Sequence, residues 1–312
     1  MSSPAPRCDV MRVQDDFDVS GEVQLCHTVT GICFPLTNSG PGNEERSIQM
    51  KGDARTIMIA ESPFRLDNEV ALITGGGSGI GLGIARCMIK AGARTVLVGR
   101  RKEQLATACA ELGPQSSSVV HDITRLDDAS ELVSAAERLT GAPITILVNN
   151  AGIHLKKFAQ QTTPEEFQGV LNTHVLAAHA VTCAVVPGMI KQKHGSILFI
   201  SSMTAFMGLT QVVAYAAAKS AYFGMVATLS AELSVDGVRV NAIAPGWIDS
   251  EMCRNALDSD AARKSRVFSR IQMGRMGQPE DIGWAAVYLS APAAAYVTGV
   301  TLPVDGGAVV GF

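Results

Sequence analysis

From residue 64 onward, short apolar and β-branched runs alternate with longer segments of helical character. The first such runs are Val70–Thr74 and Thr95–Gly99, and a helical segment follows each. Each run is apolar at successive positions, so both faces of the strand must be covered by other parts of the chain. Strands that alternate with helices in this way form a parallel sheet with right-handed crossovers. We therefore expect an α/β fold: a doubly wound parallel sheet of about seven strands, with helices on both faces.

The same alternation continues to the C-terminus and predicts the other elements. We expect helices over 79–91, 101–112, 127–140, 164–192, 213–233 and 279–290. The remaining strands are expected over 118–121, 144–149, 196–202, 238–243 and 300–304. In sheets of this kind ligands bind outside the carboxyl ends of the strands, and the motifs described below fall at such ends. Residues 64–312 should therefore form a single domain that contains the binding sites.

Residues 1–63 differ from the rest in composition. Pro, Asp, Ser and Gly occur there in loose order, and the apolar piece from Thr28 to Leu36 shows little periodicity. Such a segment has too little apolar surface to build a core. We expect an N-terminal extension that is disordered or loosely attached, and Met50 and Met58 are possible translation starts within it. A regulatory or partner-binding tail is the alternative.

The composition argues against several classes of function. Hydrophobic residues make up 47% of the chain, and the net charge is −3 without any long basic run that would suit a nucleic acid. No segment of about 18 uncharged, apolar residues predicts a membrane span. The seven cysteines are scattered and form no metal-binding spacing with the six histidines. We therefore expect no metal site, reduced thiols and a cytoplasmic location.

A glycine-rich turn follows the first strand and opens the first helix. It reads Thr74-Gly-Gly-Gly-Ser-Gly-Ile-Gly81. Glycines let the backbone approach a pyrophosphate closely, and the positive end of the helix favours its charge. Such a turn can be purely structural, but its place between a strand and a helix favours a dinucleotide site. The expected cofactor contacts here are Gly75, Gly77, Ser78, Gly79, Ile80 and Gly81.

The end of the second strand bears on which dinucleotide is bound. A carboxylate at this place would bind the adenosine ribose of NAD and repel a 2′-phosphate. The sequence has Gly99 there, followed by Arg100 and Arg101. Guanidinium groups suit a phosphate, so NADP(H) is favoured over NAD(H), with Arg100 as the expected contact. The alternative is that both arginines lie in solvent at the start of a helix.

Three residues near the fifth strand could move a proton. Ser202 ends that strand, Tyr215 lies thirteen residues later, and Lys219 follows Tyr215 by four. Positions i and i+4 share one face of a helix, so Tyr215 and Lys219 should point the same way. A nearby ammonium lowers the pKa of a phenol, and a hydroxyl opposite could hold a carbonyl oxygen. Tyr-x-x-x-Lys alone is a weak motif, and an ordinary helix face is the alternative.

Taken together, these motifs resemble the short-chain dehydrogenase/reductase family over about four-fifths of the chain. The resemblance implies an NADP(H)-dependent oxidoreductase that interconverts a keto group and a secondary alcohol, with cofactor and substrate sites in one domain. The supporting motifs, in the family's order and at its spacings, also include Asp122 after the third strand, Asn149-Asn-Ala-Gly152 after the fourth, Arg239-Val-Asn-Ala-Ile-Ala-Pro-Gly246 and Asp305-Gly-Gly307.

The resemblance also implies roles for individual residues. Tyr215 would be the general acid in reduction and the base in oxidation. Lys219 would hold the nicotinamide ribose and lower the pKa of Tyr215, and Ser202 would orient the substrate carbonyl. The other implied contacts are with the cofactor: Asp122 and Ile123 at the adenine, Asn149, Ala151 and Gly152 at the sheet centre, and Pro245, Gly246, Ile248 and Ser250 around the nicotinamide.

One position departs from the family's pattern. The family usually has an Asn in its long fourth helix, which completes a water relay to the lysine, and His174 stands at that place. Imidazole can accept and donate hydrogen bonds, so His174 is included among the expected catalytic residues. Because it titrates near neutrality, it could add a pH dependence that Asn would not. A packed histidine without a role is the alternative. His154 has no partner spacing and is expected in a loop or at the surface.

The substrate is less constrained than the cofactor. The loops expected around it, including 247–274, are rich in Met and apolar residues, which suits a small ketone, keto-sugar or keto-acid. One alternative is a 3-oxoacyl group on the acidic acyl carrier protein, for which Lys191, Lys193 and His194 offer part of a docking patch. Glu232 and Asp236 weigh against that alternative. The other alternative is a sensor that binds NADP(H) without turnover.

The two longest expected helices suggest an assembly. Segments 164–192 and 213–233 are richer in Ala and Val than one face of a sheet can bury. Excess apolar surface on helices usually meets a partner subunit. We therefore expect a homodimer or a homotetramer.

Overall fold

The computed structural model describes residues 62–249 and 261–311 of the chain. All of them belong to one compact unit, which spans Glu61–Phe312. The expected N-terminal extension lies outside the described residues except for Ser62 and Pro63, so its character stays a prediction. Pro63 already contacts the domain, because its carbonyl accepts a hydrogen bond from the amide of Ala293.

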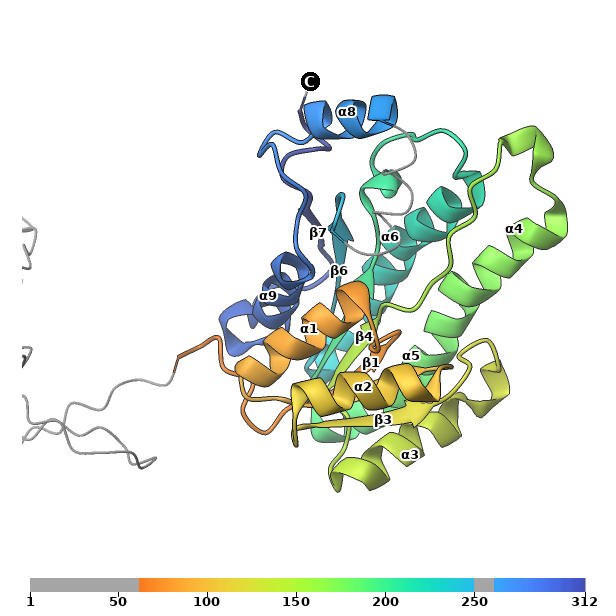
Figure 1. The fold of residues 1–312 in the computed structure, drawn as a ribbon. Helices are drawn as coiled ribbons and strands as arrows, with labels where there is room; N and C mark the ends of the chain where they lie inside the picture. The colour runs from red at the N-terminus through yellow and green to blue at the C-terminus, as the bar shows by residue number, and fades with distance from the viewer. Residues whose placement is uncertain (1–61, 250–260, 312) are drawn as a thin grey trace, which may run out of the picture. The chain divides into compact units, whose positions relative to one another are not determined.

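The centre of the domain is one parallel sheet of seven strands (Figure 1). The strands are β1 (Val70–Thr74), β2 (Arg94–Gly99), β3 (Ser116–Val120), β4 (Ile146–Asn149), β5 (Gly195–Ile200), β6 (Val238–Pro245) and β7 (Thr301–Val304). Their order is β3-β2-β1-β4-β5-β6-β7, so the chain builds outward from β1 in one direction and from β4 in the other. This order confirms the expected doubly wound fold, and the winding reverses where the carboxyl ends of β1 and β4 meet.

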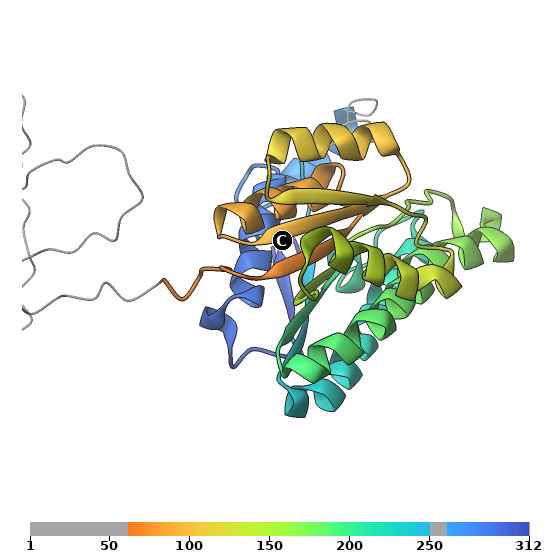
Figure 2. The same cartoon turned by 90° about the horizontal axis from the view of Figure 1, so that it is seen from below.

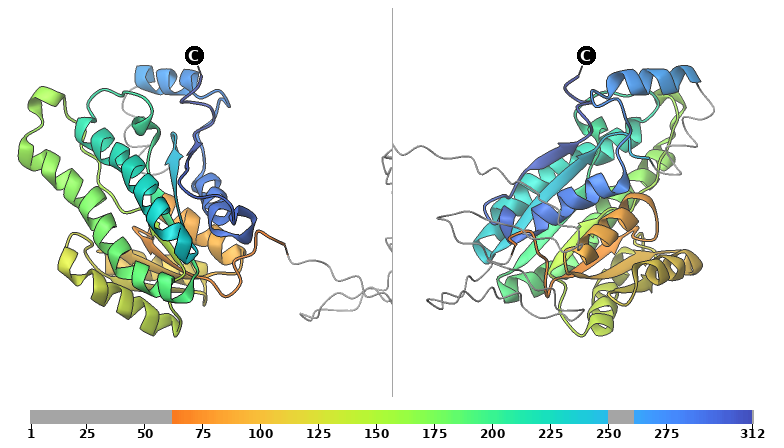
Figure 3. Two further views of the ribbon diagram at one scale, coloured as in Figure 1. Left: turned by 180° about the vertical axis from the view of Figure 1, so that it is seen from behind. Right: turned by 60° about the vertical axis from the view of Figure 1, so that its left-hand side comes forward.

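Helices cover both faces of this sheet, as seen from below in Figure 2. One face carries α1 (Gly79–Lys90), α2 (Lys102–Leu112) and α9 (Pro279–Ser290), and the other carries α3 (Ala129–Thr140), α5 (Ala177–Gln192) and α6 (Val213–Leu233). Figure 3 shows α5 and α6 side by side on their face. Strand residues alternate between the two cores: Ile73 shares a core with α1, whereas Leu72 shares one with α3 and α5. Continuously apolar strands are required because both cores are buried.

The helix over 164–192 consists of three parts. Thr163 and Glu166 form a reciprocal capping box at the start of α4 (Pro164–Leu171), a π-turn follows over Asn172–Leu176, and α5 completes the run. The wider turn was not expected from the sequence. By length and apolar composition alone, this run would also pass as a membrane span, which the sequence analysis did not foresee. In the domain it is a core helix, with Val181 and Val185 buried in the layer against the sheet.

One helix was missed by the sequence analysis. It is α8 (Ala261–Arg270), which falls within the segment expected to be a loop. Its pattern is weak because few of its residues are apolar. Val267 and Ile271 are buried in a small separate cluster with Trp247 and Met276, so contacts outside the helix determine which side it buries.

Close packing of α1 against α9 holds the start of α1 in place. A Cβ at Gly83 would lie 2.5 Å from the Cβ of Pro279, and a Cβ at Gly283 would lie 2.6 Å from the Sγ of Cys87. Both distances are shorter than side chains allow, so only glycine permits this helix spacing. The glycine-rich turn is thereby attached to a rigid pair of helices.

Gly283→Ala should lower the free energy of unfolding by about 1–3 kcal/mol, because the added methyl group overpacks the contact between α1 and α9. The matched control is Gly169→Ala in α4, where an added Cβ meets no atom within 4 Å. This control should raise the free energy of unfolding by up to about 1 kcal/mol through helix propensity. Urea denaturation followed by circular dichroism measures both. Equal stability of the two variants would contradict the packing argument.

Candidate active site

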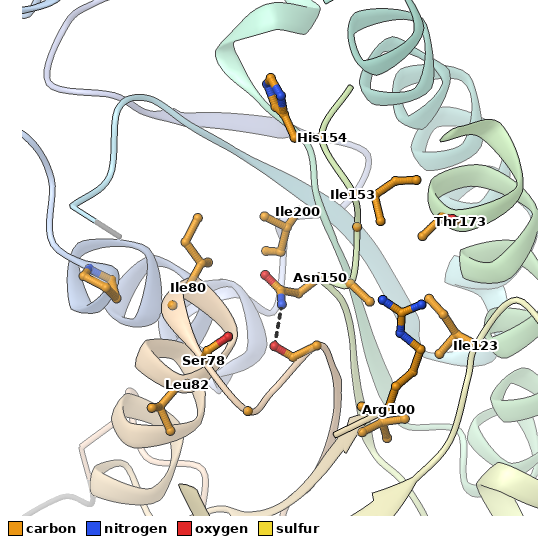
Figure 4. A pocket seen from close by; sticks show the side chains of 18 of the residues that line it. Ser78, Ile80, Leu82, Arg100, Ile123, Asn150, Ile153, His154, Thr173 and Ile200 are labelled. Atoms are coloured by element: carbon orange, nitrogen blue, oxygen red, sulfur yellow. Dashed lines mark hydrogen bonds between the residues drawn. The ribbon is translucent and has the colours of Figure 1, made fainter. Parts of the chain in front are cut away.

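A cavity of about 840 Å³ opens at the carboxyl edge of the sheet, where the winding reverses (Figure 4). One end is formed by the turn between β1 and α1 and by residues that follow β2 and β3. The other end reaches the residues after β5 and β6 and the first part of α6. Its volume is typical of a ligand pocket. The expected site residues that line it are Gly75, Gly77, Ser78, Gly79, Ile80, Arg100, Asp122, Ile123, Ala151, Gly152, Ser202, Tyr215, Lys219, Pro245 and Gly246.

The glycine turn has the backbone conformation that its residues suggest. Gly75 and Gly79 have φ angles of +65° and +52°, a region that glycine adopts readily. Gly81 lies behind the cavity wall, and a Cβ there would overlap the carbonyl oxygen of Gly75. The side chain of Ser78 makes no capping hydrogen bond, so the first amide groups of α1 need other acceptors. An anionic group at this helix start would supply them.

Asn150 holds the turn in place, although it was not among the expected contacts. Its side-chain amide donates hydrogen bonds to the carbonyls of Thr74 (2.9 Å) and Gly75 (3.1 Å), and Figure 4 draws its bond to the turn. The Thr74 hydroxyl accepts bonds from the backbone amides of Asn150 (3.0 Å) and Ala151 (3.1 Å). The ends of β1 and β4 are thus tied together. The Asn-Asn-Ala-Gly run was the signal, but spacing did not reveal which Asn reaches the turn.

Arg100 and Asp122 face each other at one end of the cavity. Arg100 Nη1 lies 4.0 Å from Oδ2 of Asp122, and the arginine side chain is 70% exposed. The other carboxylate oxygen of Asp122 accepts hydrogen bonds from the amide (3.0 Å) and the hydroxyl (2.8 Å) of Thr124. These bonds, with a smaller contribution from Arg100, hold the pKa of Asp122 below its usual value. An exposed ion pair of this length is weak, so Arg100 remains available to another anion.

The end of β5 is tied to α6 through three consecutive residues. The Lys219 ammonium donates a hydrogen bond to the carbonyl of Ile200 (2.6 Å). The Ser201 hydroxyl donates to the carbonyl of Lys219 (2.9 Å), and the side chain of Ser202 lies near enough to the phenol of Tyr215 to affect its pKa. Lys219 Nζ lies 5.6 Å from the centre of the Tyr215 ring, as the shared helix face predicts. The fold therefore brings Ser202, Tyr215 and Lys219 together at one end of the cavity.

The electrostatics of these residues differ from the expectation. Burial raises the pKa of the Tyr215 phenol, and the nearby side chain of Ser202 offsets only part of this effect. Burial also lowers the pKa of Lys219 to about 7, because the charged ammonium loses its water. The expectation that the pKa of Tyr215 lies below its ordinary value is therefore wrong for this structure, because desolvation of the phenol raises it. A lysine that titrates near neutrality carries only part of a charge there, and desolvation of the phenol is the larger effect.

His174 lies beside the cavity, with its imidazole packed against Gly152. A Cβ at Gly152 would overlap the imidazole, and the ring of Tyr215 lies edge-on with its centre 5.5 Å away. Nε2 of His174 is 3.0 Å from the amide nitrogen and 2.8 Å from the carbonyl oxygen of Ile153, so either tautomer finds a backbone partner. Nδ1 is buried and has no hydrogen-bond partner within residues 62–249 and 261–311.

His174 is neutral at physiological pH. Burial, followed by the positive charge of Lys219, lowers its pKa to about 3. The expected pH dependence near neutrality is therefore wrong, because a buried imidazole lacks the water that would stabilise its charge. What His174 contributes is a hydrogen bond to the backbone of Ile153 that does not change with pH.

His154 lies at the site although the sequence suggested only a loop or surface position. It lines the cavity, is labelled in Figure 4, and its ring centre is 5.0 Å from that of Tyr215. Thr173, next to His174 in the π-turn, also lines the cavity. The only signal for His154 was its place in the loop after Gly152. Its contact with Tyr215 joins residues far apart in the sequence, which no local spacing reports.

Two other expected contacts, Asn149 and Ile248, do not line the cavity. Asn149 is buried and donates a hydrogen bond to the hydroxyl of Thr182 (3.1 Å). Ile248 is buried in the core, and its neighbour Asp249 lines the cavity instead. Ser250 lies outside the described residues, so its expected contact with a cofactor stays a prediction.

The residues around this cavity fit a nicotinamide dinucleotide. The glycine turn leaves room where side chains would collide, and the start of α1 offers amide donors for a pyrophosphate. Arg100 and Asp122 would hold the adenosine part, and Tyr215 and Lys219 the nicotinamide part. The two sets of residues line one continuous cavity, so one extended ligand can touch both.

Known proteins share this arrangement. A family profile described as enoyl-(acyl carrier protein) reductase matches residues 75–309. The 3-oxoacyl-acyl-carrier-protein reductase FabG of Vibrio harveyi is 35% identical over 245 residues, which are 78% of this chain and 98% of that protein. The crystal structure of a gluconate 5-dehydrogenase from Burkholderia cenocepacia, in complex with NADP and tartrate, is 32% identical with a TM-score of 0.76 and covers 80% of this chain and 98% of that chain. A short-chain type dehydrogenase/reductase from Mycobacterium marinum is 29% identical with a TM-score of 0.74 and covers 79% and 98%.

The chain belongs to the short-chain dehydrogenase/reductase family. It is an oxidoreductase that interconverts alcohol and carbonyl groups. Within this short-chain dehydrogenase/reductase, the long fourth helix places His174 beside the reactive tyrosine, where the family usually has Asn. The histidine is accommodated because Gly152 leaves space for its ring.

In this short-chain dehydrogenase/reductase, His174→Asn should keep kcat within about threefold, because an amide can still bond to the backbone of Ile153. Its pH–rate profile should parallel that of the wild type between about pH 6 and 9, since a neutral histidine adds no titration there. His174→Leu cannot make the bond and should lower kcat about tenfold. A wild-type titration that disappears in His174→Asn would contradict the neutral assignment.

The same variant gives a second readout. The folded protein disfavours protonated His174, whereas the unfolded chain takes up that proton below about pH 6.5. The wild type should therefore lose stability as the pH falls from about 6.5 to 4.5, and His174→Asn should lose less. Tm measured by circular dichroism across this range tests it, and identical slopes for the two proteins would argue against a buried neutral imidazole.

Proposed function

We propose that this protein is an NADP(H)-dependent carbonyl reductase that acts on a small ketone, keto-sugar or keto-acid and on the corresponding secondary alcohol. The observation that supports this most is the convergence of Ser202, Tyr215 and Lys219 at one end of a cavity whose other end carries the glycine turn and Arg100. A proton donor and a site for a hydride carrier are thus parts of one cavity.

The side chains would divide the chemistry as follows. The bound nicotinamide dinucleotide supplies the hydride. Ser202 donates a hydrogen bond to the carbonyl oxygen of the substrate, and Tyr215 gives its phenolic proton to the same oxygen as negative charge develops. Because burial raises the pKa of Tyr215, the phenol is protonated at neutral pH, which is the form that reduction requires. Lys219 is held by Ile200 close to the Tyr215 ring, where its positive form stabilises the phenolate that results.

Arg100 supports NADP(H) over NAD(H). It follows β2 directly, where a carboxylate would exclude a 2′-phosphate, and Gly99 leaves that place without a side chain. The exposed guanidinium of Arg100 lies 4.0 Å from the carboxylate of Asp122, which is a weak ion pair. A phosphate would bind the guanidinium more strongly than this carboxylate does. The solved gluconate 5-dehydrogenase with NADP agrees with this choice.

The basic residues considered as a carrier-protein docking patch lie at the opposite edge of the sheet. Lys191 and Lys193 end α5, and His194 immediately precedes the start of β5, whereas the cavity lies beyond the carboxyl end of that strand. A strand of this length separates the two edges by about 20 Å. His194 is also bound to Glu69, at 2.9 Å.

The acidic residues that weighed against the carrier protein lie at the same distant edge. Glu232 and Asp236 come at the end of α6 and directly before β6. Neither set of charges therefore bears on docking at the mouth of the cavity. Without the basic patch, a small free ketone is the better supported substrate, and the carrier-bound acyl group remains an arm of the experiment below.

We further propose a cytoplasmic homodimer or homotetramer with no nucleic-acid or membrane partner. On α6, the small residues Ala217, Gly224 and Ala227 are exposed, and small side chains allow a second helix to approach closely. Within the described part of the chain, Cys87, Cys109 and Cys183 are free thiols, which suits a reducing compartment.

Tyr215→Phe should lower kcat for ketone reduction by about 10²- to 10⁴-fold, because the variant has no proton to donate. NADPH affinity should change by less than about threefold, since the ring remains in place. The assay follows NADPH oxidation with a simple ketone, a keto-sugar acid and a 3-oxoacyl thioester as substrates. Binding of NADPH by the wild type without turnover of any ketone would favour the sensor alternative. Preference for the thioester would favour the carrier-protein alternative.

Arg100→Ala should raise the KM for NADPH by about 10- to 100-fold, because a charge-assisted contact with a phosphate is lost. The KM for NADH should change by less than about threefold, since NADH has no such phosphate. Arg138→Ala on α3 is the matched control: its arginine is exposed and pairs with Glu131 at 2.7 Å. Steady-state kinetics with both cofactors decide the matter, and an equal rise in both KM values would contradict a role in recognising the phosphate.

A further inference from the structure

Tyr222 is a buried tyrosine that contacts two of the active-site residues. It lies on α6, three positions after Lys219 and on the same side of the helix. Its side chain is fully buried, and its hydroxyl donates a hydrogen bond to the backbone carbonyl of His174 at 2.8 Å. In the sequence its spacing continues the Tyr-x-x-x-Lys motif by one further turn.

The π-turn explains why the His174 carbonyl can accept this bond. Within the turn the backbone pairing changes from i+4 to i+5, as in the hydrogen bond from the amide of Ala177 to the carbonyl of Asn172. An extra residue in a helical turn frees a carbonyl group for a donor from outside the helix. In this structure the donor is the phenol of Tyr222.

The ring of Tyr222 also lies against Lys219. Lys219 Nζ is 5.0 Å from the centre of that ring, closer than it is to the ring of Tyr215. The Tyr222 ring also packs against Phe199 of β5, with the ring centres 5.0 Å apart. A cation near an aromatic face is stabilised, and the effect is larger where water is excluded. The ring is therefore a fixed support for the buried ammonium.

We propose that Tyr222 is a positioning residue of this active site, which uses its hydroxyl to hold the π-turn that carries His174 and its ring to support the ammonium of Lys219. The two parts of the side chain act on different partners, so they can be separated by substitution. A purely structural core tyrosine would affect stability alone. The proposal rests on the function proposed above only for its kinetic readout.

The ring's part is tested without any cofactor. The groups that face Lys219 are Tyr215 and Tyr222 from α6, His174 from the π-turn and the Ile200 carbonyl from β5. The carbon-13 signal of the Lys219 side chain, followed by NMR against pH, reports its titration. Tyr222→Leu should move the titration down by about one pH unit, because the charged form loses its aromatic support. Tyr222→Phe keeps the ring and should move it by less than about 0.3 unit.

The hydroxyl's part is tested by kinetics. Tyr222→Phe leaves the His174 carbonyl without its donor, so the π-turn is held less firmly and kcat should fall about tenfold. The KM for the ketone should change by less than about threefold, because Tyr222 does not line the cavity. Tyr288→Phe, a partly buried tyrosine of α9 that packs beside Phe64, is the matched control and should leave kcat unchanged.

Three outcomes would overturn the proposal. One is an unchanged Lys219 titration in a folded Tyr222→Leu. Another is an unchanged kcat in Tyr222→Phe. A third is a loss of Tm in Tyr222→Phe that accounts for all lost activity, so that kcat per folded molecule equals that of the wild type. If the wild type reduces no ketone, the proposed function fails, while the NMR titration still decides the role of the ring.

Discussion

The active site of this protein is built around a buried lysine. Lys219 is 3% exposed, and a charged group without water is stable only where other groups replace the lost hydrogen bonds. Here the carbonyl of Ile200 supplies one hydrogen bond, and two tyrosine rings lie near the ammonium. These groups come from the end of β5 and from α6. The hydrogen bond that Lys219 needs therefore also holds α6 against the end of β5. Ser202 and Tyr215 belong to the same two elements and are thereby placed against each other.

Two irregular pieces of backbone complete the site, and each is held by a side chain from elsewhere. The glycine turn after β1 is held by Asn150 from the end of β4. The π-turn between α4 and α5 is held by Tyr222 from α6. Such turns leave backbone groups without regular partners, so a well-placed polar side chain stabilises the shape that a ligand will meet. Both irregular segments at the cavity are therefore tied to the main elements of the fold by side-chain hydrogen bonds.

Much of this fold could be predicted from local patterns. Continuous apolar runs predicted the central strands within a few residues, because both faces of the sheet are buried there. The glycine turn could be predicted because its φ angles suit glycine, and the shared face of Tyr215 and Lys219 follows from helix geometry. Helix α8 was missed because only a small external cluster around Val267 stabilises it. The expected lowering of the Tyr215 pKa and the expected titration of His174 near neutrality were also wrong, since burial decides both and burial is not a local property.

By itself, the sequence determined the alternation of strands and helices along the chain and the place of the glycine turn. It also determined that Tyr215 and Lys219 lie on one face of a helix. These features depend on residues within one or two turns of each other, so a periodic pattern records them. Only the tertiary structure decided which polar groups meet: Asn150 reaches Gly75 from 75 residues away, and Tyr222 reaches His174 from 48 residues away. It also decided which of these groups lose water. Hydrogen bonds and desolvation of this kind depend on what packs around a residue, and the pattern of its neighbours in the chain does not contain that information.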